Sequence, residues 1–101
     1  MANRLDLGIE LRNILGNSNV YFQPPESIRL SYPCAIYELT DMDTVYANNK
    51  PYRVDKAYQI TIIDKDPDSK IPDKVAALPQ TRFVRYFTSD NLNHYVFIIY
   101  W

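Results

Sequence analysis

The run from Tyr52 to Ile62 alternates between apolar and polar side chains, and it constrains the fold more than any other stretch. A side-chain period of two is typical of a β-strand with one buried and one exposed face. The predicted buried face, with Lys56 as its single exception, consists of Tyr52, Val54, Tyr58, Ile60 and Ile62. The opposite face consists of Arg53, Asp55, Gln59 and Thr61. The sequence therefore predicts a sheet that is covered on one face.

Other segments of the chain are also predicted to be strands. They are residues 20–22, 34–39 with a continuation to about Asp41, 82–88, and about 95–100. The first ends at Gln23-Pro24-Pro25, because proline cannot donate to a sheet ladder. The second, CAIYEL, is apolar and is expected to lie in a central, covered position. Asn48 and Asn49 separate two strand-like runs, and asparagine tolerates the left-handed conformations of tight turns.

A helix is predicted near the N-terminus, over residues 3–15. Its apolar residues follow the period of an α-helix and form one stripe: Leu7, Leu11, Ile14 and Leu15. Asn3 is the expected N-cap, and Gly16 followed by Asn17 is expected to end the helix.

A second helix of about two turns is predicted after the aspartate-rich loop DKDPDS. Asp68 or Ser69 is the expected cap, Pro72 falls in the first turn and Pro79 closes the helix. Its apolar stripe consists of Ile71, Val75 and Leu78. Helices near either end of a set of local hairpins predict an α+β fold. We expect one domain over residues 1–101, with an antiparallel or mixed sheet of four to five strands covered on one face by both helices.

Charge and composition exclude several classes of function. The net charge is -1, from 11 basic and 12 acidic residues, and no basic cluster is visible. Sequence-independent nucleic-acid binding needs a concentrated positive face, so it is not expected. No stretch has the composition of a transmembrane helix or of a secretion signal, and the single cysteine suits a reducing compartment. These features predict synthesis in the cytoplasm. The 9 tyrosines suit half-buried strands and subunit contacts.

The candidate catalytic residues are few. The only histidine lies in Asp90-Asn91-Leu92-Asn93-His94, which the sequence favours as a turn that bonds its own backbone, with Leu92 as an anchor. The alternative is a small hydrolase that uses His94 and Asp90. Cys34 lies in an apolar strand, where a thiol is usually inert.

No metal or cofactor site is expected from the sequence. One histidine and one cysteine do not make a zinc site. The loop DKDPDSKIPD lacks the glycine and the terminal glutamate of an EF-hand, and it is interpreted as a loop followed by a helix cap. Glycine occurs only at positions 8 and 16, neither of which is placed to cradle phosphate.

Four stretches together resemble one protein family. NVYFQPP, YPCAIYEL, KPYRVDKAYQITIIDKDPDS and FTSDNLNHYVFIIYW are similar to parts of the tail-terminator, or tail-completion, proteins of bacteriophages with long non-contractile tails. The resemblance runs from about Leu7 to Trp101, and the four stretches occur in the same order.

The resemblance implies a structural protein without catalytic activity. Such proteins form a ring, usually of six subunits, that caps the completed tail tube, stops its elongation and joins the tail to the head. The implied partners are further copies of the chain, the major tail tube protein and the head-completion or connector protein. DNA would pass through the lumen without specific binding. The implied location is the tail–neck junction of the virion, after assembly in the bacterial cytoplasm. A head–tail connector or stopper ring is the alternative within the same class.

The expected contact surfaces follow from exposure and stiffness rather than from a motif. The candidates for subunit or partner contacts are Pro24, Pro25, Asp41, Asp43, Asn48, Asn49, Lys50, Tyr100 and Trp101. The last strand is apolar to its end, so both of its faces should be covered. A neighbouring subunit is expected to cover one face and to meet the strand's edge hydrogen-bonding groups. The alternative is a strand that lies centrally in the sheet of a monomer.

Overall fold

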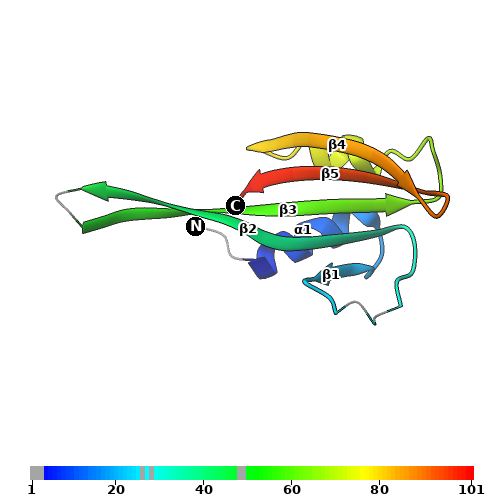
Figure 1. The fold of residues 1–101 in the computed structure, drawn as a ribbon, viewed down its shortest axis with the longest axis horizontal. Coiled ribbons are helices and arrows are strands. Elements are labelled where there is room, and N and C mark those ends of the chain that lie inside the picture. The colour runs from blue at the N-terminus through cyan, green and yellow to red at the C-terminus, as the bar shows by residue number, and fades with distance from the viewer. Residues whose placement is uncertain (1–3, 26, 28, 48–49) are drawn as a thin grey trace.

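The protein folds as a five-stranded mixed sheet with two helices packed on one face, an α+β architecture (Figure 1). The computed structural model describes residues 4–25, 27, 29–47 and 50–101, and the side chains of residues 43–54 lie outside that description. The elements, in chain order, are α1 (Arg4–Leu15), β1 (Val20–Phe22), β2 (Cys34–Ala47), β3 (Lys50–Asp64), α2 (Ile71–Ala76), β4 (Thr81–Ser89) and β5 (Leu92–Tyr100).

The sheet order is β1-β2-β3-β5-β4. β1 pairs parallel to β2, and the other neighbours are antiparallel. β5 therefore lies between β3 and β4, and its backbone groups are used in two ladders. The expectation that the edge of the last strand meets a neighbouring subunit is wrong for this reason. The alternative prediction, that the last strand lies centrally in the sheet, gives the position of β5 correctly.

The core lies between the sheet and the helices. Ile60, Ile62 and Phe97 are completely or almost completely buried, and they pack with Leu7 of α1 and Val75 of α2. The alternation of β3 is confirmed over its described side chains, since Tyr58, Ile60 and Ile62 share the buried face and Lys56 is its exposed exception. The predicted stripe of α1 is also confirmed, with Leu11 buried and Ile14 and Leu15 packed against the core.

Three predicted boundaries differ from the structure, and the first is the end of β2. β2 continues to Ala47 rather than to about Asp41, because β3 pairs with it along almost its whole length. The resulting hairpin of β2 and β3 projects beyond the rest of the sheet and gives the molecule a long axis of 51 Å (Figure 1). The covered position expected for β2 applies only near its start, since β1 flanks it only at Ala35–Tyr37.

The connection between β4 and β5 is shorter than the five residues predicted. Ser89 already pairs with Leu92, which leaves Asp90 and Asn91 as the turn. Their φ angles are 53° and 63°, as in a type I′ turn, which suits the twist of a hairpin. Asparagine and aspartate tolerate this conformation at modest cost, so the residue types had favoured a turn but did not reveal its length.

The start of α2 also differs from prediction. The N-cap position is Lys70, with no capping hydrogen bond from its own side chain, rather than Asp68 or Ser69. The Ser69 hydroxyl still accepts a hydrogen bond from the Ile71 N–H at 3.3 Å, so a neighbour supplies part of the capping. Pro72 lies in the first turn as expected, where its missing N–H has no intrahelical partner to lose. The predicted cap of α1, Asn3, lies outside the described residues.

Candidate functional site

The group of residues at the start of β5 is built around Asn93, which is buried. Its side-chain N–H donates to the backbone oxygens of Asp64 and Lys65, at 3.1 and 3.4 Å. Its Oδ1 accepts a 2.6 Å hydrogen bond from the Tyr86 hydroxyl. Asn93 therefore ties the end of β3 and the following loop to the β4–β5 hairpin. Leu92, expected as the anchor, is only half-buried, so the amide rather than the leucine fixes this corner.

His94 is held by local contacts. Its Nδ1 lies 3.1 Å from the backbone oxygen of Leu92, and its ring stacks on Phe87 with centroids 4.6 Å apart. This is the local hydrogen bonding that the sequence favoured for the histidine. Both contacts position the ring as part of the sheet surface.

Cys34 and His94 lie on the same face of the sheet but do not meet. Cys34 is opposite Ile63 on β3, and Ile63 is opposite His94 on β5. Two strand spacings of roughly 4.8 Å separate the two backbones, and the side chain of Ile63 lies between them. A nucleophile and its base need hydrogen-bond contact, at about 3 Å. The geometry therefore does not form the cysteine–histidine pair.

We expect Cys34 to react slowly in the folded protein. Burial, and to a lesser degree the negative charge of Asp64, raises the pKa of the Cys34 thiol to about 11. Since the thiolate is the reactive form, this shift alone should slow alkylation at pH 8 on the order of a hundredfold relative to the unfolded chain. Iodoacetamide labelling with and without urea measures the ratio. Equal rates in the two states would contradict the placement of Cys34.

The aspartate-rich loop between β3 and α2 uses its carboxylates to hold its own backbone. Asp64 Oδ1 accepts from the Asp66 N–H at 3.1 Å, and Asp66 Oδ1 accepts from the Asp68 N–H at 2.9 Å. These are Asx turns, which stabilise a loop locally. In the part of the chain that the structure describes, no three histidine, cysteine, aspartate or glutamate side chains are grouped as metal ligands.

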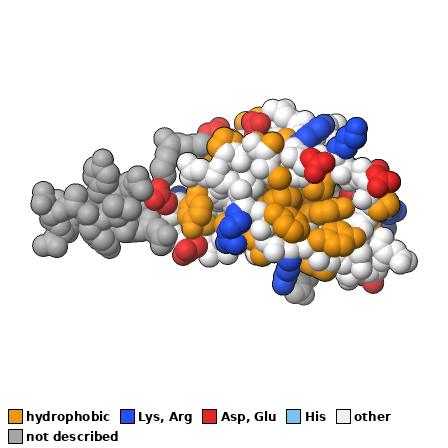
Figure 2. Space-filling view, turned by 90° about the horizontal axis from the view of Figure 1, so that it is seen from above, with side chains coloured by type: hydrophobic (Ala, Val, Ile, Leu, Met, Phe, Trp, Pro, Cys, Tyr) orange, Lys and Arg blue, Asp and Glu red, His pale blue; other side chains and the backbone are white. Residues whose placement is uncertain are grey.

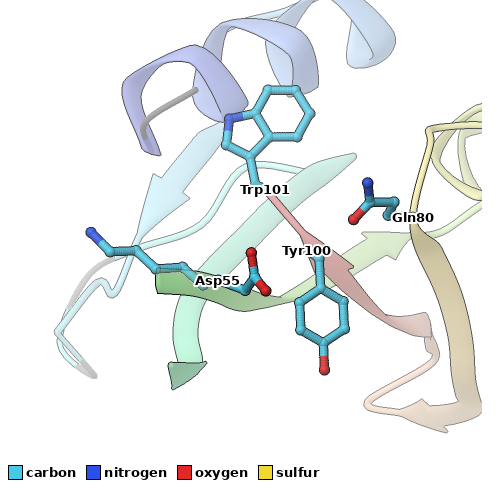
Figure 3. A pocket seen from close by; sticks show the side chains of 5 residues that line it. Asp55, Gln80, Tyr100 and Trp101 are labelled. Carbon is cyan, nitrogen blue, oxygen red and sulfur yellow. The ribbon is translucent and has the colours of Figure 1, made fainter. Parts of the chain in front are cut away.

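The C-terminal end of the chain lines a small hollow of about 140 Å³, together with residues of β3 and with Gln80, which directly precedes β4 (Figure 3). Trp101 points toward α1 and packs against the core, whereas Tyr100 points to the opposite side of the sheet and is 43% exposed. The backbone N–H of Tyr100 donates to the backbone oxygen of Gln80, and the backbone N–H of Trp101 donates to the backbone oxygen of Lys56. The hollow is well below the size of a typical small-molecule site. Trp101 is thus mainly a core residue, and Tyr100 keeps a free surface.

Among the described residues, β4 carries the largest group of exposed large apolar side chains, and sequence reasoning had not placed a contact there. Phe83 is 52% exposed and Tyr86 is 49% exposed, and Val84 and Phe87 are also exposed. Figure 2 views the molecule from the β4 edge, and hydrophobic side chains gather in the middle of this face. A run of exposed aromatic side chains is typical of an interaction surface.

A groove of about 280 Å³ continues this surface toward α2. It is lined by Tyr95 and Phe97 of β5 and by Phe83 and Tyr86 of β4, whose rings are in aromatic contact across the two strands. The sequence contained a sign of this surface, because the polar and apolar residues of TRFVRYF do not alternate strictly, as they would on a strand with one buried face. A bulge between Phe83 and Arg85 disrupts the alternation and leaves no clean buried face on the strand.

The other predicted contact residues are scattered. Asp41 and Pro25 are exposed, and Pro24 is half-buried at the corner that follows β1. The side chains of Asp43 and Lys50, and the whole of Asn48 and Asn49, lie outside the described residues. Asp41, Pro24 and Pro25 therefore lie at the opposite edge of the sheet from β4 and do not form one surface with it.

Comparisons with known proteins give no relative for this chain: no family model, no curated protein and no solved structure matches it. Among the helices of the described residues, none has the length and apolar character needed to cross a membrane.

Proposed function

We propose that this chain is a structural assembly protein that forms a ring, of six subunits in the simplest case, on the end of a phage tail tube. The ring would stop tube elongation and dock the tail onto the head connector. The proposed location is the tail–neck junction of the virion. The proposed partners are further copies of the chain, the tube protein and the head-completion protein, with DNA passing through the lumen unbound.

The exposed aromatic surface of β4 carries the assembly part of this proposal. Phe83 and Tyr86 expose about half of their surface beside an apolar groove. Protein interfaces are enriched in such aromatic side chains at their centres. The hydrogen bond and the ring stacking that hold His94 on the sheet surface favour assembly over the hydrolase alternative, which relies on His94 and Asp90. The choice of a tail terminator among assembly proteins rests on the four stretches that resemble that family.

We expect the purified protein to form a ring, either alone or on the ends of assembled tail tubes. Light scattering over a concentration series, with and without tubes, measures the mass, and electron microscopy of the tubes shows whether their ends are capped. Capped tubes that no longer elongate when fresh tube subunits are added would support a terminator.

A ring that ignores tubes but binds the head connector would instead indicate the connector or stopper alternative. A protein that stays monomeric and binds neither structure would remove the basis of the proposal.

A further inference from the structure

The outer edge of β4 has no strand beside it in the described structure. β4 has 9 residues and pairs only with β5. Its side chains from Arg82 to Ser89 are all exposed. An unpaired strand of this length presents a row of backbone N–H and C=O groups that another strand can complete. The chemistry of the edge thus specifies an extended segment as its partner.

A second free edge lies at the other side of the sheet. β1 flanks β2 only at Ala35–Tyr37, and the Gln23 side chain then accepts a hydrogen bond from the Leu39 N–H. From Asp41 to Ala47, β2 pairs with β3 alone among the described residues. The sheet therefore ends in two unpaired edges, one on each side.

The two edges carry opposite charge. β2 contains Glu38, Asp41 and Asp43 and no basic residue, whereas β4 contains Arg82 and Arg85 and no acidic residue. Except for Asp43, whose side chain is not described, these side chains are exposed.

The charges also share one side of the sheet. Glu38 and Arg82 stand in the same row across the strands, through Gln59 and Ile98. Asp41 opposes Ala57 of β3, and Arg85 opposes Val96 of β5, which in turn opposes Thr61 of β3. Ala57 and Thr61 lie on the same side of β3 as Gln59, so Asp41 and Arg85 project from this side as well. Side chains at alternate positions of a strand share a face, so all four charged groups face away from the helices.

Apolar side chains match on the other side. Leu39 and Met42 of β2 oppose Tyr58 and Lys56, which places them on the helix side, and they are 40% and 51% exposed. On β4, Phe83 and Tyr86 oppose Phe97 and Tyr95 and lie on the same side. Joining the two edges would therefore place acidic groups near basic groups on one face and apolar groups near aromatic rings on the other.

We propose that β4 of one copy pairs antiparallel with the Asp41–Ala47 part of β2 of a second copy. β4 runs opposite to β2 within the sheet, because the intervening pairs are all antiparallel. Copies with the same orientation therefore bring the two edges together in antiparallel fashion. Such a head-to-tail contact uses different surfaces on each partner and closes into a ring when the rotation permits. The inference specifies the subunit contact of the proposed ring and rests on that function.

The same charges select against the simplest competing contact. If β4 paired with β4 of another copy, Arg82 and Arg85 would face arginines of that copy, and like charges across a strand pair are destabilising.

The proposed contact also requires a stagger between the copies. β1 blocks the first part of β2, so the second copy must be shifted along the strands. A stagger of this kind tilts the strands relative to the axis, as it does in closed barrels.

A charge-exchange experiment tests the contact. Full-length chains carrying R82E/R85E or D41K/D43K are each measured alone, mixed in equal amounts, and combined in one chain with all four changes. Mass is followed by light scattering, in solution and on tube ends. K65E/K74E, on exposed lysines outside both edges, changes the net charge as much as R82E/R85E and is the matched control. Circular dichroism confirms folding.

We expect each double variant alone to lose at least tenfold in self-association, and the mixture and the fourfold variant to recover it. The control should assemble like the original chain. Rings that form equally well from either double variant, or a loss that the mixture does not restore, would overturn the edge contact and leave the proposed function standing. An original chain that assembles neither alone nor on tubes would overturn both.

Discussion

Replacing Phe97 with alanine is expected to cost about 3–5 kcal/mol of the free energy of unfolding, the largest effect of any single truncation in this fold. Phe97 is 1% exposed and is the largest fully buried side chain among the described residues. It lies on the helix side of β5 among the core residues. Its removal takes away apolar contacts and leaves a cavity that the surrounding strands can fill only in part. For a domain of this size such a loss is a large fraction of the total stability.

Phe83→Ala provides the matched control, because Phe83 is the residue opposite Phe97 on β4. The two rings make an edge contact at 5.5 Å, but Phe83 is 52% exposed. Its truncation should cost about 1 kcal/mol, the usual scale of an aromatic pair. Urea unfolding followed by tryptophan fluorescence measures both variants. Equal losses of stability in the two variants would contradict the structure, in which Phe97 is buried and Phe83 is about half exposed.

The sequence was sufficient to predict the fold wherever a periodic pattern was supported by packing. The alternation that ends at Ile62 and the stripe that begins at Leu7 were correct because both represent a buried face. The short strand β1 was also predicted with its observed limits, since Gln23-Pro24-Pro25 follows it directly. In these places local preference and tertiary contact favour the same structure.

The rest depends on pairing that no local pattern contains. The position of β5 inside the sheet follows from its ladders with both β3 and β4, and the sequence shows only that the strand is apolar. The length of the β4–β5 turn depends on the pairing register of the two strands. A shift of this register by one residue moves every side chain of a strand to the other face of the sheet. The exposed surface of β4 was missed because Arg82–Thr88 is rich in aromatic residues, and these usually indicate burial rather than a free edge.

The role of Asn93 was also missed, although the sequence had singled out the segment that contains it. Its partners are the backbone of Asp64 and Lys65 and the hydroxyl of Tyr86, all brought to it by the fold. An alternation of apolar and polar residues predicts whether a side chain points toward the core or toward solvent, but it does not identify buried hydrogen-bond partners. Asn93 in sequence is one more polar residue near a turn.

Asn93→Ala should cost about 2 kcal/mol, the second-largest effect that we expect. The change removes hydrogen bonds at a buried position and leaves polar groups of the β3–α2 loop without their partner, which typically costs 1–3 kcal/mol. Thr88→Ala is the matched control, since Thr88 is opposite Asn93 on β4 but is exposed, and it should change stability by about 0.5 kcal/mol or less. Both are measured by urea unfolding.

Tyr86→Phe separates the two halves of the Asn93 network. It removes only the hydroxyl that donates to Asn93 Oδ1, and it keeps the ring that contacts Tyr95 at 5.0 Å. Its cost should be about 1 kcal/mol, between the control and Asn93→Ala. Hydrogen exchange should then be faster in the loop after Asp64 for Asn93→Ala and nearly unchanged for Tyr86→Phe, because only the first change frees the loop backbone. Similar exchange rates in the loop for both variants would show that Asn93 does not hold the loop to the hairpin.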